Sequence, residues 1–398
     1  MAVDVQGPRS EETTAVAPWW RDERKLGLVT QLLVVLVVIG VFAVLFYFML
    51  ENQKRLGVPM SLGFLENPAG FQLSFATISV TLDSPISRIL VVGALNTLFA
   101  AAISAVLATV VGLIIGILRL SNNFLIAKLA AAYIETLRNT PLLLQLVFWY
   151  GGVVAFLPSV RESLSLFNVI FLNKKGLFTP QPIFESGAGF VGLALLVAIA
   201  GSVFLARWAH RRQEATGQRF PVFSVSVAAI ILLPLLVSLA LGNPVTWDVP
   251  VKGGFNFSGG LVFQPEIVAL IIGLGLNTSA FIAEIVRGGI IAISHGQTEA
   301  SLALGLKPRW TLRLVIIPQA LRIIIPPMVS QYLNVVKNST LAGFIGFPDL
   351  FSVIGTSQNQ TGRAVECVTI LMLFYLVVSL IISTVLNWYN KRVALVER

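Results

Sequence analysis

The chain has 398 residues, of which 56% are hydrophobic and only 12% charged, and its formal net charge is +9. Roughly a quarter of the residues in a soluble domain are charged, so this composition excludes a soluble protein and predicts one that crosses a membrane many times. The long apolar runs do not alternate with period two, which favours membrane helices over a β-barrel. The basic excess is interpreted as a topology signal rather than as a nucleic-acid surface.

About eight transmembrane helices are predicted, so the fold class is an all-α polytopic membrane protein. Residues 1–25 are polar and of mixed charge, which indicates a cytoplasmic segment rather than a cleavable signal peptide. Trp19 and Trp20, just before the first apolar run, are typical of an interfacial anchor. The predicted spans are Leu26–Leu50, Ile89–Leu118, Pro141–Leu157, Gly189–Ala206, Pro221–Leu241, Glu266–Val286, Ile323–Phe347 and Val368–Trp388.

The fourth and fifth spans form a separate pair. They carry almost no polar residues within the membrane and are joined by the basic hairpin Arg207–Arg219, so the segment at about 188–242 is interpreted as an inserted or peripheral helix pair. An even number of spans puts both termini on one side, and this side then holds 19 of the 28 Lys and Arg residues. The positive-inside rule predicts that this side is the cytoplasm.

Charges interrupt the apolar pattern just before the third span. Glu135 and Arg138 are three residues apart, so they share a helix face and can form an ion pair. Pro141 can start the next helix. This element is interpreted either as a gate or subunit contact at the cytoplasmic mouth, or as an ion pair that anchors the helix.

The sixth span contains Asn277, Thr278 and Glu284, the last of them three residues before Arg287. Ionisable groups inside a membrane are costly and usually face a cavity or a partner, so these residues are candidates for a substrate pathway. For Asn277 and Thr278, hydrogen bonds between helices are an equal alternative.

A polar insert separates the sixth and seventh spans. Ser294 followed by Gln297 has the pattern of a capping box, which predicts a helix start. Gly305 can supply the left-handed residue that ends this helix, and Pro308 can begin the next one. Glu299 is expected in the first turn, where the helix dipole favours an anion. The insert therefore predicts two helices that meet at a sharp corner.

The seventh span carries a polar stripe made of Asn334, Lys337, Asn338 and Thr340. A lone ammonium inside a span must pair with an acid or face water. The stripe can bind a substrate carboxylate through Lys337. Alternatively it is a structural network, in which a fixed partner such as Glu284 neutralises the ammonium.

The polar insert resembles the EAA loop of ABC-importer permeases, in which Glu-Ala-Ala is followed after three residues by Gly and, nine residues later, by Ile-x-Leu-Pro. Here the loop reads Glu299-Ala300-Ser301, then Gly305, then Val315-Ile316-Ile317-Pro318. The stretches Glu135–Leu143 and Ala283–Gly289 resemble permeases of the polar amino acid uptake family, the histidine/glutamine type. Eight spans in about 400 residues are similar to the general L-amino acid permeases of that family.

The resemblance implies a type I ABC-importer permease core over residues 88–398, after a first span and periplasmic loop at 26–87. It also implies that Glu299, Ala300, Gly305 and Pro308 contact a dimer of ATP-binding subunits, which holds ATP and Mg, so that no cofactor is expected on this chain. The other implied partners are a second permease subunit, identical or homologous, and a periplasmic amino-acid-binding protein. Amino acids would then cross the bacterial inner membrane by alternating access.

Two other classes of function require sequence features that this chain lacks. An ion-coupled secondary transporter of small polar solutes would show inverted repeats and broken helices at matching positions, and no such halves are visible. An enzyme is not expected, because the sequence has neither a Gly-x4-Gly-Lys-Ser/Thr phosphate loop nor a nucleophile–histidine–acid set. The one cysteine and two histidines, in unrelated segments, indicate neither a disulfide framework nor a metal site.

Overall fold

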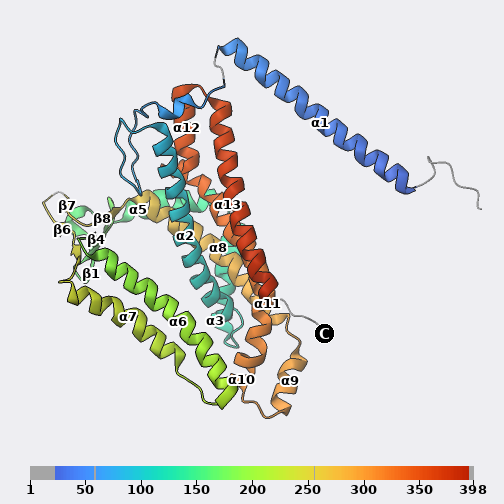
Figure 1. Cartoon of the computed structure of the whole chain (residues 1–398), viewed down its shortest axis with the longest axis vertical. Helices are drawn as coiled ribbons and strands as arrows, with labels where there is room; N and C mark the ends of the chain where they lie inside the picture. The colour runs from blue at the N-terminus through green and yellow to red at the C-terminus, as the bar shows by residue number, and fades with distance from the viewer. Residues whose placement is uncertain (1–22, 58–59, 255, 394–398) are drawn as a thin grey trace, which may run out of the picture. The chain divides into compact units, whose positions relative to one another are not determined.

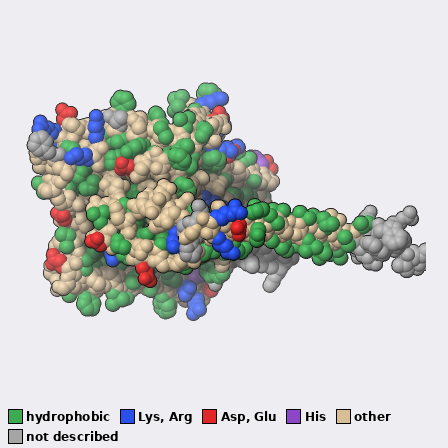
Figure 2. All heavy atoms as spheres, turned by 90° about the horizontal axis from the view of Figure 1, so that it is seen from above, with side chains coloured by type: hydrophobic (Ala, Val, Ile, Leu, Met, Phe, Trp, Pro, Cys, Tyr) green, Lys and Arg blue, Asp and Glu red, His purple; other side chains and the backbone are tan. Residues whose placement is uncertain are grey.

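The computed structural model describes residues 23–57, 60–254 and 256–393. Most of the predicted cytoplasmic segment 1–25, with Trp19 and Trp20, lies outside the described residues. The chain divides into two compact units, Met1–Gly63 and Phe64–Arg398. The first unit contains one long helix, α1 (Glu23–Leu56), whose side chains form an almost continuous hydrophobic cover (Figure 2). Its stretch Leu26–Arg55 is long enough to cross a bilayer, which confirms the first predicted span as a long apolar helix.

The second unit is a bundle of helices with a small region of strands (Figure 1). Its longer helices are α2 (Ile86–Leu118), α3 (Phe124–Asn139), α6 (Ala188–Thr216), α7 (Val222–Ala240), α8 (Pro265–Ile291), α11 (Ile317–Asn338), α12 (Leu350–Thr361) and α13 (Ala364–Val393). The shorter ones are α4 (Leu142–Val147), α5 (Val154–Phe156), α9 (His295–Ala303) and α10 (Pro308–Thr311). Two π-helical turns, Phe148–Val153 and Leu312–Ile316, and a 3₁₀ stretch, Ser339–Ile345, continue α4, α10 and α11.

Seven helices of the described chain are long and apolar enough to span a membrane, against the eight that were predicted. The difference lies in the third predicted span, where the only apolar helix is the short stretch Leu142–Val153. This short helix continues the course of α3 along α8. Tyr133 of α3 bonds to Ser279 of α8 through their hydroxyls at 2.6 Å, and further along Leu146 of α4 lies against Gly273. The third crossing is thus a broken helix over residues 124–156, and the charges in α3 concealed its first half.

Helices α2 and α8 form the centre of the second unit. Gly112 and Gly116 of α2 face Ile282 and Val286 of α8 so closely that a Cβ atom at Gly112 would lie 2.7 Å from the Ile282 side chain. Without a hydrophobic driving force between helices in lipid, small residues allow this close approach and gain van der Waals contact. The spacing of the two glycines, four residues apart, therefore has a packing role.

Short strands flank the inserted helix pair, and none of them was predicted. The pairs β4–β5 and β6–β7 are antiparallel, and a four-stranded sheet has the order β1-β2-β3-β8. Because β4 ends just before α6 and pairs with β5 just after α7, the strands close the base of the insertion. The two ends of the segment at about 188–242 therefore lie together, and its interpretation as an inserted helix pair stays a prediction. The strands are β1 (Leu164–Leu166), β2 (Ile170–Asn173), β3 (Gly176–Thr179), β4 (Gln181–Phe184), β5 (Val245–Asp248), β6 (Val251–Lys252), β7 (Phe257–Ser258) and β8 (Leu261–Phe263).

Helix α12 was also missed by the sequence reasoning. Buried Asn96 of α2 holds the chain just before it, because its amide donates to the carbonyls of Phe75 and Pro348 at 3.0 and 2.9 Å. The hydroxyl of Thr97 accepts a hydrogen bond from the backbone N–H of Leu350 at 3.0 Å. These two residues therefore dock α12 onto α2.

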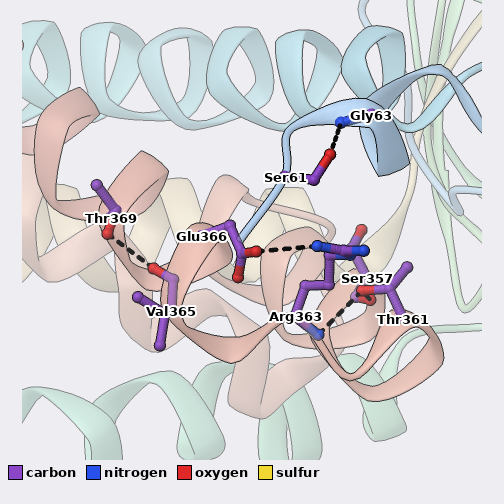
Figure 3. A network of polar contacts seen from close by, with 8 residues as sticks. All are labelled: Ser61, Gly63, Ser357, Thr361, Arg363, Val365, Glu366 and Thr369. Carbon is purple, nitrogen blue, oxygen red and sulfur yellow. Dashed lines mark hydrogen bonds and ion pairs between the residues drawn. The ribbon is translucent and has the colours of Figure 1, made fainter. Parts of the chain in front are cut away.

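The turn from α12 into α13 is fixed by polar contacts (Figure 3). Arg363 forms an ion pair with the buried Glu366 at 3.1 Å, and its backbone N–H donates to the Thr361 hydroxyl. That hydroxyl in turn donates to the carbonyl of Ser357 at 2.7 Å. Because one partner is buried, removing the arginine would leave an uncompensated acid and is costly.

Asp349 caps α12 by accepting from the backbone N–H of Ser352 at 2.9 Å. Its side chain is fully buried, and among the described residues its second oxygen has no hydrogen-bond partner. Burial raises the pKa of the Asp349 carboxyl from its ordinary 3.8 to about 7. The folded protein therefore binds this proton more tightly than the unfolded chain does, and stability falls as pH rises from about 4 through about 7.

We expect Asp349→Asn to be stabilising at high pH. Asparagine caps helices as well as aspartate does, and it carries no charge to desolvate. Between pH 5 and pH 8 its advantage over the wild type should grow by roughly 3 kcal/mol, measured by unfolding of the purified protein in detergent. Asp349→Ala, which loses the cap, is the control and should be less stable than Asp349→Asn at both pH values. An identical pH dependence of wild type and Asp349→Asn would contradict this assignment.

Candidate functional site: a polar cavity and a helical corner

The break between α3 and α4 creates the first part of the site. Pro141 has no N–H group, so the carbonyl of Leu137 loses its helical partner. The amide of Gln145 donates to this carbonyl at 2.8 Å and to that of Thr140 at 2.9 Å, and Asn277 of α8 donates to Leu137 at 3.2 Å. Broken backbone inside a membrane protein needs such partners, and breaks of this kind commonly line substrate cavities.

A cavity of about 310 Å³ lies at this break, between α3, α4, α8 and α11. Its polar lining comes from amides, hydroxyls and one guanidinium, and its volume is at the lower end of the range for ligand pockets, about 300–1,000 Å³. Asn277 and Thr278 are buried, whereas Arg138 and Asn334 are exposed. The lining residues are Arg138, Thr140, Pro141, Leu142, Asn277, Thr278, Phe281, Gln331, Asn334 and Asn338.

Five of the predicted pathway residues meet in this cavity: Arg138, Asn277, Thr278, Asn334 and Asn338. Thr140, Phe281 and Gln331 line it as well but were not proposed from sequence. The polar ones carried a signal, since Gln331 is three residues before Asn334 and extends the same stripe by one helical turn. Phe281 carried no sequence signal for a site, because an aromatic residue in an apolar span is usually a packing residue.

Arg138 does not form the predicted ion pair with Glu135. Its guanidinium lies over the ring of Phe281, 5.4 Å from the centroid, and among the described residues no ion pair joins it to Glu135. Glu135 is exposed on α3 and outside the cavity lining. The cation–π contact holds the guanidinium on the ring and leaves its donors available to a ligand.

Glu284 forms the second predicted ion pair, which the structure does contain. Its carboxylate accepts from the Nε atom of Arg287 at 3.0 and 3.2 Å. The alternative in which Glu284 is the fixed partner of Lys337 is therefore wrong, because this carboxylate already has a cation one turn away. Glu284 does not line the cavity.

Lys337 lies in the last turn of α11, where its side chain is exposed and outside the cavity lining. Among the described residues it has no acidic partner within ion-pair distance. Thr340, one turn on, donates from its hydroxyl to the carbonyl of Lys337 at 2.9 Å, which closes the end of the helix. The cavity therefore contains the amides of the predicted stripe but not its ammonium.

The second part of the site is the corner between α9 and α10. Gly305 has φ +79°, and it ends α9 with two hydrogen bonds: its own N–H donates to Leu302 and the next N–H, of Leu306, donates to Ser301. This is the Schellman arrangement, which needs a residue that tolerates positive φ. Pro308 is the first residue of α10, as predicted. The predicted corner of two helices is confirmed.

Two details of the corner differ from the prediction. Ser294 caps α9 but accepts from the backbone N–H of Gly296 at 3.3 Å, while Gln297 does not complete a capping box. Instead the side-chain oxygen Oε1 of Gln297 accepts from the Nε2 atom of Gln319 at 3.2 Å, which links α9 to α11. Glu299 lies in the second turn rather than the first and contacts His295 at 3.0 Å. Both side chains are exposed.

The corner closes over a mainly apolar hollow of about 680 Å³. Its walls come from the end of α8, from α9 and from α10 with the following π-helical turn. Ala300 and Glu299 face away from this lining, whereas Pro308 is part of it. No group of three or more His, Cys, Asp or Glu residues that could hold a metal ion occurs in the described part of the chain.

Comparison with known proteins agrees with the helical membrane architecture. The family model of the binding-protein-dependent transport system inner membrane component matches residues 198–395. The general L-amino acid transport system permease protein AapQ of Rhizobium johnstonii is 48% identical over 377 residues, which are 95% of this chain and 94% of that protein. The chain belongs to the family of binding-protein-dependent transport system inner membrane components.

A second relative is also similar to this permease over nearly the whole length of both chains. The putative amino-acid ABC transporter permease protein YhdX of Escherichia coli is 46% identical over 92% of this permease and 94% of its own length. Among solved structures, an amino acid ABC transporter crystallised with histidines is 22% identical, with a TM-score of 0.47, and covers 77% of this permease and 94% of that chain.

Proposed function

We propose that this permease moves amino acids across the bacterial inner membrane by alternating access, as the membrane subunit of an ATP-binding-cassette importer. The names of the two relatives, both amino acid permeases, support the substrate class. The polar cavity at the break between α3 and α4 is the observation that carries the proposal. It contains one cation, Arg138, and no acid among the described lining residues.

Such a cavity suits the groups that all amino acids share. The guanidinium can hold an α-carboxylate with two parallel hydrogen bonds, which is the strongest neutral-pH recognition of a carboxylate by a side chain. The amide oxygens of Asn277, Asn334 and Asn338 can accept from the α-ammonium. Because no second charged side chain lines the cavity, a substrate's own side chain is not selected by charge, which favours a broad range of amino acids.

The remaining machinery belongs to partners. ATP and Mg bind to a separate dimer of ATP-binding subunits, so this permease carries no cofactor and hydrolyses nothing itself. Glu299, Ala300, Gly305 and Pro308 present the corner to that dimer. Lys337 and Thr340 belong to the surface that meets a second permease subunit, identical or homologous, where the ammonium adds a second cation to the pathway. A periplasmic amino-acid-binding protein delivers the substrate.

Orientation can be measured separately. With both termini and the corner in the cytoplasm, reporter fusions placed after Arg219 and after Lys391 are both expected to give a cytoplasmic signal. The reason is that 19 of the 28 Lys and Arg residues then lie on the cytoplasmic side. A fusion after Lys252, between α7 and α8, is the control and should report the periplasm. A periplasmic signal at either of the first two positions would reverse the topology.

Transport by the assembled complex tests the proposal itself. Vesicles that contain the permease with its partners should take up labelled amino acids only with ATP inside the compartment that holds the ATP-binding subunits. Ionophores that collapse the ion gradients should leave uptake intact. Uptake that fails with ionophores and continues without ATP would establish ion-coupled transport instead.

A further inference from the structure

Helix α6 extends well beyond the end of its partner α7. The start of α6 and the end of α7 lie at one level, because Phe184, just before α6, is paired with Val245, just after α7, across β4 and β5. At the other end α6 has 29 residues and α7 only 19, so α6 is longer by about 15 Å at 1.5 Å per residue. The rings of Trp208 and Phe220 meet with their centroids 5.5 Å apart, which places the start of α7 beside Trp208.

This overhang begins where a bilayer ends. About 20 helical residues cross the hydrocarbon core, and 20 residues counted from Ala188 reach Arg207. Trp208 and Phe220 then lie at the level of an interfacial aromatic belt. The last turns of α6 and the return to α7, residues 209–221, lie at the level of the phosphate groups.

Three arginines and no lysine occupy this level, Arg211, Arg212 and Arg219, and a fourth, Arg207, lies just before it. The one acid, Glu214, lies 3.6 Å from His210. Arg212 lies over the ring of Trp208 and donates to Gln218 at 3.2 Å. In the part of the chain that the structure describes, the other three arginines have no side-chain partner, and all four are exposed.

Little of the hairpin is buried within the described chain. The buried side chains of α6 are Ala194, Ala198 and Ala209, and α7 has none among the described residues. Small residues pack α6 against α7, while large ones such as Phe204, 71% exposed, point outward. A helix pair that is apolar on its outer faces is covered by acyl chains, so the ligands nearest to its basic end are lipid headgroups.

From this geometry we infer that the overhang of α6 is a binding site for the headgroups of anionic phospholipids. The basic excess supplies the charge complementarity, and a guanidinium matches a phosphodiester with two parallel hydrogen bonds where an ammonium makes a point contact. Arg212 on Trp208 forms a fixed floor beside the three free arginines. The site is independent of the cavity between α3, α4, α8 and α11 and of the proposed substrate.

Fluorescence of Trp208 can test this site in the assembled transporter. The Trp208 signal is obtained by subtracting the spectrum of a Trp208→Phe variant, since the chain has 7 tryptophans. The complex is placed in bilayers that contain either brominated phosphatidylglycerol or brominated phosphatidylcholine at equal mole fraction. We expect the anionic lipid to quench Trp208 severalfold more, and added salt to reduce this preference.

The combined variant Arg207→Gln, Arg211→Gln, Arg219→Gln should lose the preference for the anionic lipid. Each arginine removed should reduce this preference by about fivefold at most. Quenching by brominated phosphatidylcholine should be unchanged in it, which shows that the hairpin still lies in the bilayer. The matched control Lys128→Gln, Arg309→Gln, Arg313→Gln removes the same charge elsewhere and should keep the preference. Should the first variant fail to assemble, the inference is tested by the wild type alone, whose preference for the anionic lipid should fall as salt is added.

Two results would overturn the inference. Equal quenching of wild-type Trp208 by both lipids, at low and high salt, would show that the arginines are only a solvated topology signal. Absence of quenching by either lipid would show that a protein subunit covers the overhang in the complex.

Discussion

Replacement of Gly305 by valine is expected to abolish transport while the permease still folds. At φ +79° a side chain with a Cβ atom is strained by about 1–2 kcal/mol, and a β-branched one by more, so the corner between α9 and α10 must change shape. No atom lies within 4 Å of the position that a Cβ would occupy, so the strain stays local. A helix that docks into a partner by its shape loses that contact when its exit angle changes.

Uptake and substrate-stimulated ATPase activity of the complex measure this effect. Gly242→Val is the matched control, because Gly242 also has positive φ, +74°, and open space around it, but lies at the far end of α7. It should keep both activities. Gly305→Asn should retain part of the transport, since asparagine tolerates the left-handed conformation. Normal transport by Gly305→Val would remove the coupling role from this corner.

The second large effect is expected for Arg138→Gln, which should lower the uptake efficiency by roughly 10- to 100-fold. A hydrogen bond to a charged group is worth about 1.5–3 kcal/mol, and glutamine keeps the side chain polar but cannot form the charged fork with a carboxylate. Folding should be unaffected, because Arg138 is exposed and its contact within the described chain is the ring of Phe281.

Lys128→Gln is the matched control for this change. It removes a cation from the same helix, α3, but from an exposed position outside the cavity. Its uptake should stay near that of the wild type. The loss in Arg138→Gln should concern all transported amino acids alike, because it acts on their common carboxylate. A loss for acidic amino acids alone would instead assign Arg138 to side-chain recognition.

Local signals made the corner predictable from the sequence. A left-handed glycine and a proline at the first helical position act through their own backbone, so neither needs a distant partner. The same local signals surround α12, namely Asp349 at its start and Gly362 at its end, but its polar composition concealed a helix that Thr97, more than 250 residues away, holds by a hydrogen bond to Leu350. Burial of that kind depends on tertiary contacts.

The cavity was predictable in part for a related reason. The amides of α8 and α11 stood out because polar groups are costly in apolar spans, whereas Arg138 was placed correctly but given the wrong neighbour. Spacing along α3 indicates that Glu135 can reach Arg138, yet it does not indicate that Phe281 of another helix offers a ring. The bland composition of residues 188–242 indicated a separate helix pair, while the strands beside it were not predicted, since each has at most four residues.

From Pro308 to Ile345 the chain forms one 38-residue helical rod that joins the corner to the cavity. Its lower end is tied to α9 by the Gln297–Gln319 bond, and Asn334 lies 26 residues above Pro308, on the order of 40 Å away. Over such a lever a tilt of only about 5° moves the far end by about 3 Å, the width of a hydrogen bond. Pro326 and Pro327 interrupt the rod between these two points, so in the proposed mechanism the stiffness of the rod there sets how much of a movement at the corner reaches the cavity.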